Sequence, residues 1–363
     1  MKKILITVNH DVVIYNFRLE IVEKFLYEGH RVIISSPYGE RIDELIELGC
    51  EYIDATISRH GTNIMEDLNL FNYYLKTIRE VKPDVVLSFT IKPNIYGGIV
   101  CRLLNIPYIA NITGLGTAVE EKGIVQKISI LLYKIAFKKV NCVFFQNEEN
   151  KKFFIDNKIA IGKHKLLPGS GVNLKRFDIL EYPNKNEIHF VFISRIMQAK
   201  GIDQYLEAAE YISNKYSNVK FHVCGFCEEN YEEKLDSLDN KGIINYHGMV
   251  RKVKDILAIT HCTVHPTYYP EGLSNVLLES AASGRPIIST DRSGCREVID
   301  DSINGYIVME KNSNDLIAKI EKFINLRYSD KKNMGLAGRK KVEAEFDRQI
   351  VVNAYLSEIE NVR

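Results

Sequence analysis

The chain has 363 residues, of which 45% are hydrophobic and 26% are charged, and its formal net charge is +1. This length suits two domains of ordinary size, and the composition is that of a globular protein. A charge so close to zero argues against a protein that binds nucleic acid through bulk positive charge, so we expect no nucleic-acid partner. No run of 18 apolar residues occurs, so we expect no membrane-spanning segment.

The first half of the chain alternates short apolar runs with helical patterns. The expected strands are Ile4–Val8, Arg31–Ser35, Tyr52–Asp54, Val85–Ser88, Tyr108–Asn111 and Cys142–Gln146. The expected helices include Phe17–Glu28, Asp67–Val81, Asn94–Leu104 and Ile124–Lys139. This alternation predicts a parallel sheet with helices on both faces. Ligands of such sheets bind past the carboxyl ends of the strands, so we expect binding loops at 9–18, 90–94 and 111–116.

The segment 124–139 has a basic side. Lys127, Lys134 and Lys138 fall on one side of the expected helix, Lys139 joins its end, and most other residues are apolar. A basic amphipathic helix can lie on an anionic bilayer, which predicts a peripheral membrane contact at 124–139. Apolar residues around most of the helix circumference fit equally well a helix that is buried in the core with one solvent-exposed stripe. Both interpretations stay open.

After the polar stretch 181–187 the same pattern starts again. The expected strands are now Ile188–Ser194, Lys220–Cys224, Ile243–Tyr246, Thr263–His265, Pro286–Thr290 and Tyr306–Val308, and a last helix covers Asp347–Glu360. We therefore predict an α/β chain of two doubly wound domains in series, over residues 1–167 and 168–345, followed by a terminal helical segment, 346–363.

The seven cysteines predict no metal site and no disulfides. They are scattered along the chain, and the pair Cys224 and Cys227 has no second pair that would complete a zinc site. An odd number of cysteines without a signal peptide predicts reduced thiols and a cytoplasmic location. The N-terminal apolar run is too short for a targeting signal and suits a first buried strand better.

Two cations stand five positions apart where the second domain begins. The expected strand ends in a loop that contains Arg195 and Lys200, and Gly201 precedes a helix. Two fixed positive charges near a helix N-terminus suit a diphosphate. Arg195 would be the planar clamp and Lys200 the point charge. Taken alone, the pair fits a surface loop with two unrelated cations better, and the glutamates described next favour the diphosphate site.

Two glutamates stand eight positions apart in the segment Pro270–Ser280. Glu271 falls in a loop after an expected strand, and Glu279 falls inside the following helix. A loop carboxylate beside the backbone N–H groups of a helix N-terminus can hold sugar hydroxyls. A carboxylate deeper in the helix can hold a vicinal diol such as a ribose. An ordinary helix with a solvated glutamate at each end is the simpler alternative.

The longer pattern P-E-G-L-S-N-x-L-L-E, with R-x4-K-G upstream, resembles the retaining family 4 glycosyltransferases, which have the GT-B fold. The resemblance implies two Rossmann-like domains that face a cleft, an N-terminal acceptor-binding domain, a C-terminal nucleotide-sugar-binding domain and a last helix that crosses back to the first domain. It implies Arg195, Lys200 and Glu271 as catalytic residues. The implied donor-binding residues are Gly272, Leu273, Ser274, Asn275, Glu279, Gly225, Val250 and Arg251.

The resemblance extends to a subgroup that builds capsule, O-antigen and related glycans on undecaprenyl diphosphate. It implies a lipid-linked sugar acceptor, for which His10, Arg18, Lys92 and Thr113 are the candidate contacts. Many members carry a histidine where this chain has Thr113, so a role built on that histidine is in doubt. His10 is a possible substitute, with an incidental loop histidine as the alternative.

The resemblance implies a retaining transferase that moves a sugar, such as an N-acetylhexosamine, from a UDP-sugar to the lipid-linked acceptor at the inner face of the cytoplasmic membrane. No D-x-D triplet occurs, and two cations can neutralise the diphosphate, so we expect neither a metal nor a cofactor. The alternatives on the same scaffold are a UDP-sugar epimerase, a phosphorylase-like enzyme and a non-catalytic sugar-nucleotide-binding protein.

Overall fold

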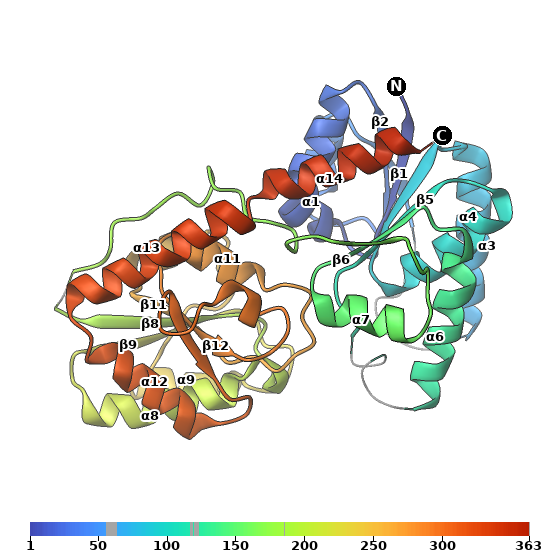
Figure 1. Cartoon of the computed structure of the whole chain (residues 1–363). Coiled ribbons are helices and arrows are strands. Elements are labelled where there is room, and N and C mark those ends of the chain that lie inside the picture. Colours follow the sequence, from blue (N-terminus) through green and yellow to red (C-terminus); the bar gives the residue numbers. More distant parts are fainter. Residues whose placement is uncertain (56–63, 117–118, 120–122, 185, 363) are drawn as a thin grey trace. The chain divides into compact units, whose positions relative to one another are not determined.

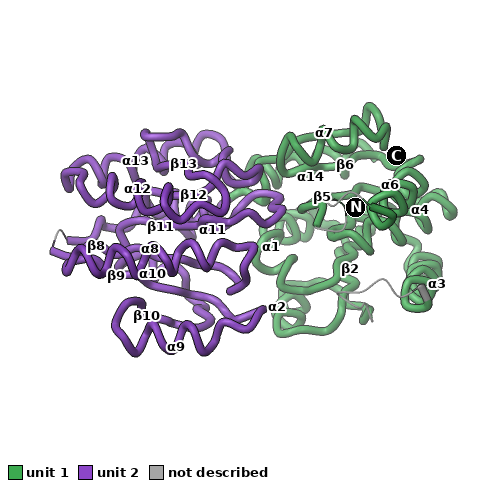
Figure 2. Tube along the Cα trace, turned by 90° about the horizontal axis from the view of Figure 1, so that it is seen from below, with its two compact units in different colours: residues 1–171, 348–363 green, residues 172–347 purple. Residues whose placement is uncertain are grey.

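The structure is a computed structural model that describes residues 1–55, 64–116, 119, 123–184 and 186–362. The chain forms two compact units (Figures 1 and 2). Unit 1 contains residues 1–171 and 348–363, and unit 2 contains residues 172–347. Each unit is an α/β layer structure built on a parallel sheet, which confirms the predicted fold class.

The described strands of unit 1 form a seven-stranded parallel sheet in the order β3-β2-β1-β4-β5-β6-β7. These strands are β1 (Lys3–Thr7), β2 (Arg31–Ser36), β3 (Glu51–Asp54), β4 (Val85–Phe89), β5 (Tyr108–Ile112), β6 (Cys142–Phe145) and β7 (His164–Leu166). The helices of unit 1 are α1 (Asp11–Tyr27), α2 (Ile42–Glu47), α3 (Ile64–Val81), a π-turn (Pro93–Gly97), α4 (Gly98–Leu104), α6 (Ile124–Ala136), a 3₁₀ turn (Phe137–Lys139), α7 (Glu148–Asp156) and α14 (Arg348–Asn361).

Successive strand residues point to opposite faces of this sheet, so each apolar strand fills two cores. Ile4 and Ile6 of β1 pack in one core with α1, α2 and α14. Leu5, between them, packs in the other core with α3, α4, α6 and α7. Burial on both faces explains why the strands are continuous apolar runs rather than alternating ones.

The described strands of unit 2 form a six-stranded parallel sheet in the order β10-β9-β8-β11-β12-β13. These strands are β8 (Ile188–Ile193), β9 (Val219–Cys224), β10 (Asn245–Tyr246), β11 (Cys262–His265), β12 (Ile287–Thr290) and β13 (Gly305–Val308). The helices of unit 2 are a 3₁₀ turn (Gln198–Lys200), α8 (Ile202–Lys215), α9 (Glu232–Asn240), α10 (Val253–Ile259), α11 (Asn275–Ala282), a second 3₁₀ turn (Arg296–Val298), α12 (Ser313–Ile324) and α13 (Tyr328–Glu345).

The last helix, α14, belongs to the first unit, as the predicted fold required. Val351, Val352 and Tyr355 are buried in the core beneath α1. Arg348, at its start, donates to Glu20 at 2.8 Å and to the Gly171 carbonyl at 3.1 Å. Gly171 has φ +64°, and a Cβ there would lie 2.5 Å from the Arg348 Cα, so a larger residue would push the helix start away.

Two loops that we predicted at strand ends of unit 1 are helical instead. The prediction of a loop over 9–18 was wrong because α1 begins at Asp11, six residues before the predicted start. His10 caps it, since its Nδ1 accepts a hydrogen bond from the Val12 N–H at 3.3 Å. The predicted loop 90–94 is also a helix start, where Pro93 occupies the first turn. None of the described helices is long and apolar enough to cross a bilayer.

Candidate functional site

The candidate site lies in unit 2, where the order of the parallel strands reverses. β8 is followed along the chain by β9 on one side, whereas β11 pairs with its other side. Crevices at the carboxyl ends of two such strands are the usual ligand sites of doubly wound sheets. Arg195 follows β8 by two residues, and Glu271 follows β11 by six. The topology therefore brings together the two sequence motifs, which are about 75 residues apart along the chain.

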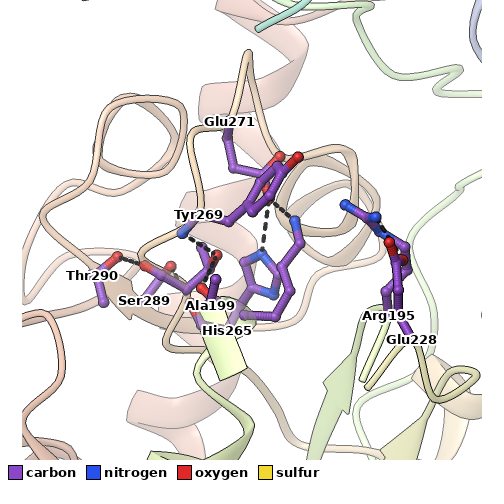
Figure 3. Close-up of polar contacts among 10 residues, drawn as sticks. Arg195, Ala199, Glu228, His265, Tyr269, Glu271, Ser289 and Thr290 are labelled. Carbon is purple, nitrogen blue, oxygen red and sulfur yellow. Dashed lines mark hydrogen bonds and ion pairs between the residues drawn. The ribbon is translucent and has the colours of Figure 1, made fainter. Parts of the chain in front are cut away.

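Three loops at this edge are joined by hydrogen bonds (Figure 3). The Tyr268 N–H donates to the Ala199 carbonyl at 2.9 Å, which links the β8 loop to the β11 loop. The Thr290 hydroxyl donates to the Thr267 carbonyl, and the Ser289 hydroxyl donates to the His265 carbonyl at 2.6 Å. These bonds tie the ends of β11 and β12 together. They hold the loops that carry the side chains of the site in fixed positions.

Lys200 and Glu271 form a buried ion pair in this site. The Lys200 side chain is 8% exposed and the Glu271 side chain 17% exposed, and the ammonium bonds the Glu271 carboxylate. The ammonium also lies 4.6 Å from the centre of the Tyr269 ring, at cation–π distance. Burial alone would raise the pKa of the Glu271 carboxyl, but Lys200 and then His265 bring that pKa below its usual value. The Glu271 carboxylate is therefore ionised at neutral pH.

Arg195 also lies close to Tyr269 (Figure 3). Its Nη1 donates to the Glu228 carboxylate at 2.6 Å, and its guanidinium carbon is 5.3 Å from the Tyr269 ring centre. Its side chain is 34% exposed. The tyrosine thus stacks against both cations of the R-x4-K-G motif, and each cation has a carboxylate partner. Both positive charges are available to a dianionic ligand that replaces those carboxylates.

His265 is a site residue that the sequence analysis placed only as the end of a strand. Its side chain is 2% exposed, and its Nε2 lies 4.0 Å from the Glu271 carboxylate. Neither ring nitrogen has a hydrogen-bond partner among the described residues. Burial, with the charge of Lys200 beside it, lowers the pKa of His265 to about 4. The neutral ring can donate to a ligand hydroxyl or accept from one. The signal in the sequence that could have identified His265 as a site residue was its position at the carboxyl end of an expected strand.

Two glycines allow the loops of the site to approach closely. Gly201 has φ +79°, and a Cβ there would lie 2.1 Å from the Pro266 carbonyl oxygen. Gly225 has φ +144°, and a Cβ there would lie 1.7 Å from the Ser194 carbonyl oxygen. A side chain at either position would push apart the loops that carry Arg195, Lys200 and Glu271. This steric requirement accounts for a glycine at both positions, and the predicted donor contact of Gly225 stays a prediction.

The remaining predicted donor residues lie around α11 and β10. Gly272, Leu273 and Ser274 are buried in the loop that enters α11, Asn275 is its first residue, and Glu279 is half-buried one turn further on. Val250 is half-buried and Arg251 exposed, in the loop after β10. The Gly225 N–H donates to the Gly248 carbonyl at 2.7 Å, which holds this loop beside the end of β9. Their ligand roles stay predictions.

The predicted acceptor residues lie in unit 1 and have varied surroundings. His10 caps α1, and Lys92 pairs with Asp67 at 3.1 Å. Thr113 is half-buried, directly after β5. Arg18 is 3% exposed, and its guanidinium carbon lies 5.3 Å from the Phe89 ring centre, so it is held in packing. Their roles as acceptor contacts stay predictions.

Three buried histidines predict acid sensitivity. Burial is the main cause that lowers the pKa of His222, His261 and His265 from 6.5 to about 4. Between these pH values the unfolded chain binds more protons than the folded chain, so their contribution to stability is present above pH 6.5 and is lost as the pH falls towards 4. We expect each histidine to cost about 2 kcal/mol of unfolding free energy between pH 7 and pH 5.

Urea unfolding of the whole chain at pH 7 and pH 5 measures this loss. The informative variant is His222→Gln, because it removes one of the three titrating groups. The quantity compared is the change in unfolding free energy between the two pH values, so the variant's stability at either pH alone does not affect the test. It should lose about 2 kcal/mol less than the parent between the two pH values. An equal loss in parent and variant would contradict the assignment of His222.

The comparisons with known proteins match both halves of the chain to glycosyltransferase families. A family model described as glycosyl transferases group 1 matches residues 176–341, and one described as glycosyl transferase 4-like matches residues 3–147. The chain is 27% identical to the N,N'-diacetylbacillosaminyl-diphospho-undecaprenol alpha-1,3-N-acetylgalactosaminyltransferase of Campylobacter jejuni, covering 94% of each chain. It is 26% identical to the capsular polysaccharide biosynthesis glycosyltransferase CapM of Staphylococcus aureus, covering 96% of this chain and 93% of that one.

Solved structures share the fold along almost the whole chain. A glycosyltransferase from Rickettsia africae superposes with a TM-score of 0.82 at 19% identity, covering 99% of this chain and 98% of that one. The structure of Anabaena HepE in complex with UDP and glucose superposes with a TM-score of 0.80 at 14% identity, covering both chains fully. At these identities the likeness establishes the fold alone.

Proposed function

Since the chain belongs to the glycosyltransferases of the GT-B fold, with a 4-like first half and a group 1 second half, we propose that it is a retaining transferase that uses a UDP-sugar. The acceptor is a sugar on undecaprenyl diphosphate, and the product serves capsule, O-antigen or glycoprotein glycan assembly. The observation that carries this proposal is the cluster of Lys200, Arg195 and Glu271 around Tyr269 at the strand-order reversal of unit 2.

The two cations take the donor diphosphate. Arg195 and Lys200 each hold a carboxylate in the structure, and a diphosphate offers them the same kind of oxygen with more charge. As the acceptor hydroxyl attacks the anomeric carbon on the face that the UDP leaves, the bond from that carbon to the diphosphate oxygen breaks. Its electron pair stays on UDP, and the acceptor proton passes to the departing diphosphate. The two cations stabilise that developing charge, so no metal is required.

Glu271 and Glu279 hold the two sugars of the donor. Glu271, with Gly272 next to it, takes hydroxyls of the transferred sugar beside the reacting carbon. Glu279, one turn into α11, takes the ribose diol. His265 lies 4.0 Å from Glu271 with both ring nitrogens unpaired among the described residues, and it orients the same sugar.

The acceptor belongs to unit 1, where His10, Lys92, Thr113 and Arg18 are the candidate contacts. The name of the Campylobacter relative describes transfer of N-acetylgalactosamine to a sugar on diphospho-undecaprenol, which supports this acceptor class and an N-acetylhexosamine donor. The bound UDP and glucose of HepE support a UDP-sugar. A lipid-linked acceptor requires work at the inner face of the cytoplasmic membrane, which the chain meets peripherally at 124–139.

The test is transfer from a panel of UDP-sugars to lipid extracts in excess EDTA. One UDP-sugar should give a lipid-linked product with an α-linkage, and the rate should be the same with and without EDTA. A β-linkage would contradict retention, and a strict need for a divalent ion would contradict the role of the cations. Interconversion of UDP-sugars without acceptor would indicate an epimerase. Binding without transfer or hydrolysis would indicate a non-catalytic protein.

A further inference from the structure

Helix α6 exposes a row of large apolar side chains. Ile124 is 76% exposed, Ile128 is 52% exposed and Leu131 is 58% exposed. Their spacing of four and three residues places them on one side of the helix. The opposite side is in the core, where Tyr133 and Ala136 are buried. Packing in the core accounts only for the apolar residues on the inner face of α6. The exposed apolar row on the outer face therefore needs another explanation.

Lysines border this row along the helix. Lys127, Lys134 and Lys138 are exposed and recur at spacings of seven and four, which places them on one flank of the apolar row. No aspartate or glutamate occurs between positions 122 and 147. This segment of unit 1 is thus positively charged and apolar at the same time.

A hollow next to the end of α6 adds two more lysines. It has a volume of about 430 Å³, and its lining includes Lys134, Lys138, Lys158 and Lys163 together with Ala160 and Ile161. Lys158 and Ala160 have φ values of +55° and +51°, which non-glycine residues rarely adopt. This unusual backbone turns the segment after α7 towards the end of α6 (Figure 1), and Ile161 stays 62% exposed at its rim.

The four lysines of the hollow are electrostatically uncompensated. Among the described residues, none forms an ion pair with Lys134, Lys138, Lys158 or Lys163, whereas nearby Lys151 pairs with Glu148 at 3.2 Å. Four ammonium groups around one small hollow repel one another unless an anion enters it. A phosphate group is an anion with enough oxygen atoms to bond several of them.

We propose that this hollow binds the phosphate of an anionic phospholipid headgroup, while Ile124, Ile128, Leu131 and Ile161 enter the membrane interface. Apolar side chains beside a basic cluster are the two signals that hold a peripheral protein on an anionic bilayer. A small soluble anion would account for the lysines but not for the exposed apolar row. The inference rests on the proposed function, since a lipid-linked acceptor requires an enzyme held at the bilayer.

Vesicle co-sedimentation of the full chain tests this inference without donor or acceptor. Wild type should bind vesicles of phosphatidylglycerol and phosphatidylcholine, and it should bind pure phosphatidylcholine much more weakly. Each lysine at an anionic surface contributes about fivefold to the binding constant. The double variant Lys134→Glu/Lys163→Glu should therefore lose at least about 25-fold. The matched control, Lys76→Glu/Lys340→Glu, changes the net charge equally at exposed lysines and should bind like wild type.

Leu131→Gln tests the apolar row separately, and it should weaken binding even at high salt, where the lysine contribution is screened. Equal binding by the lysine variant and its control would overturn the inference. So would complete competition by millimolar glycerol phosphate, because the hollow would then be a small-anion site. UDP calorimetry separates the two proposals: a chain that binds UDP but no vesicles overturns this inference alone, and the reverse result overturns the donor site alone.

Discussion

Replacement of Lys200 by Ala should lower the turnover number at least about 100-fold while the fold survives. The ammonium is buried beside Tyr269 and is assigned to the departing diphosphate, where one charge-assisted contact contributes about 2–4 kcal/mol to the transition state. The substitution also leaves Glu271 buried without its partner, so the melting temperature should fall. Donor addition should not restore the lost charge, and the turnover defect should persist at saturating UDP-sugar.

The matched control is Lys254→Ala. Lys254 lies in the same unit and also pairs with a carboxylate, that of Asp178, but the side chains are 40% and 59% exposed. Loss of an exposed pair costs little, so turnover should stay within a factor of two of wild type. Initial rates with saturating donor, alongside thermal unfolding of both variants, measure the difference. Near-normal turnover in Lys200→Ala would show that this lysine does not hold the diphosphate.

The sequence was sufficient to predict the fold because both sheets are buried on two faces. Their strands are therefore continuous apolar runs, such as Ile4–Val8, and several helices between them, such as α3 and α8, keep a clear period. Local capping was harder to predict. The run Val12–Ile14 is rich in β-branched residues, which favour strands, yet the structure places it in the first turn of α1, which His10 caps.

The candidate site was predictable in part for the same reason. Loops that follow a strand can be located from the strand itself, so Arg195, Lys200 and Glu271 could be selected from such loops. Their partners come from other loops. Glu228 is 33 positions from Arg195, and no local pattern connects the two. The hollow beside α6 depends on left-handed backbone at Lys158 and Ala160, residues whose type does not favour that conformation.

The ion pair between Lys200 and Glu271 bears on how the donor enters. A diphosphate that approaches Lys200 meets an ammonium already bonded to a carboxylate. In the proposed reaction, binding would exchange one anionic partner for another, and Glu271 would become available to hydroxyls of the transferred sugar. The pair keeps a buried charge compensated before the donor arrives. It also links the diphosphate position to the sugar position through one side chain.

Replacement of Glu271 and of Glu279 by Gln should therefore have effects of different kinds. Glu279→Gln should weaken UDP and the UDP-sugar equally, by about 10- to 100-fold, because a charge-assisted contact to the ribose contributes about 1.5–3 kcal/mol. Glu271→Gln should leave UDP affinity intact or raise it, because Lys200 loses its competing carboxylate. Turnover should fall at least about tenfold, since an anchor of the reacting sugar acts most in the transition state.

Calorimetric titration of UDP into both variants decides between these effects, and thermal unfolding adds a second readout. Without ligand, Glu271→Gln leaves Lys200 buried with no carboxylate at its ammonium, so its melting temperature should be lower than that of wild type. UDP supplies the missing negative charge and binds only the folded chain. It should therefore raise the melting temperature of Glu271→Gln at least as much as that of wild type. Equal loss of UDP affinity in both variants would show that the two glutamates do not divide the donor as proposed.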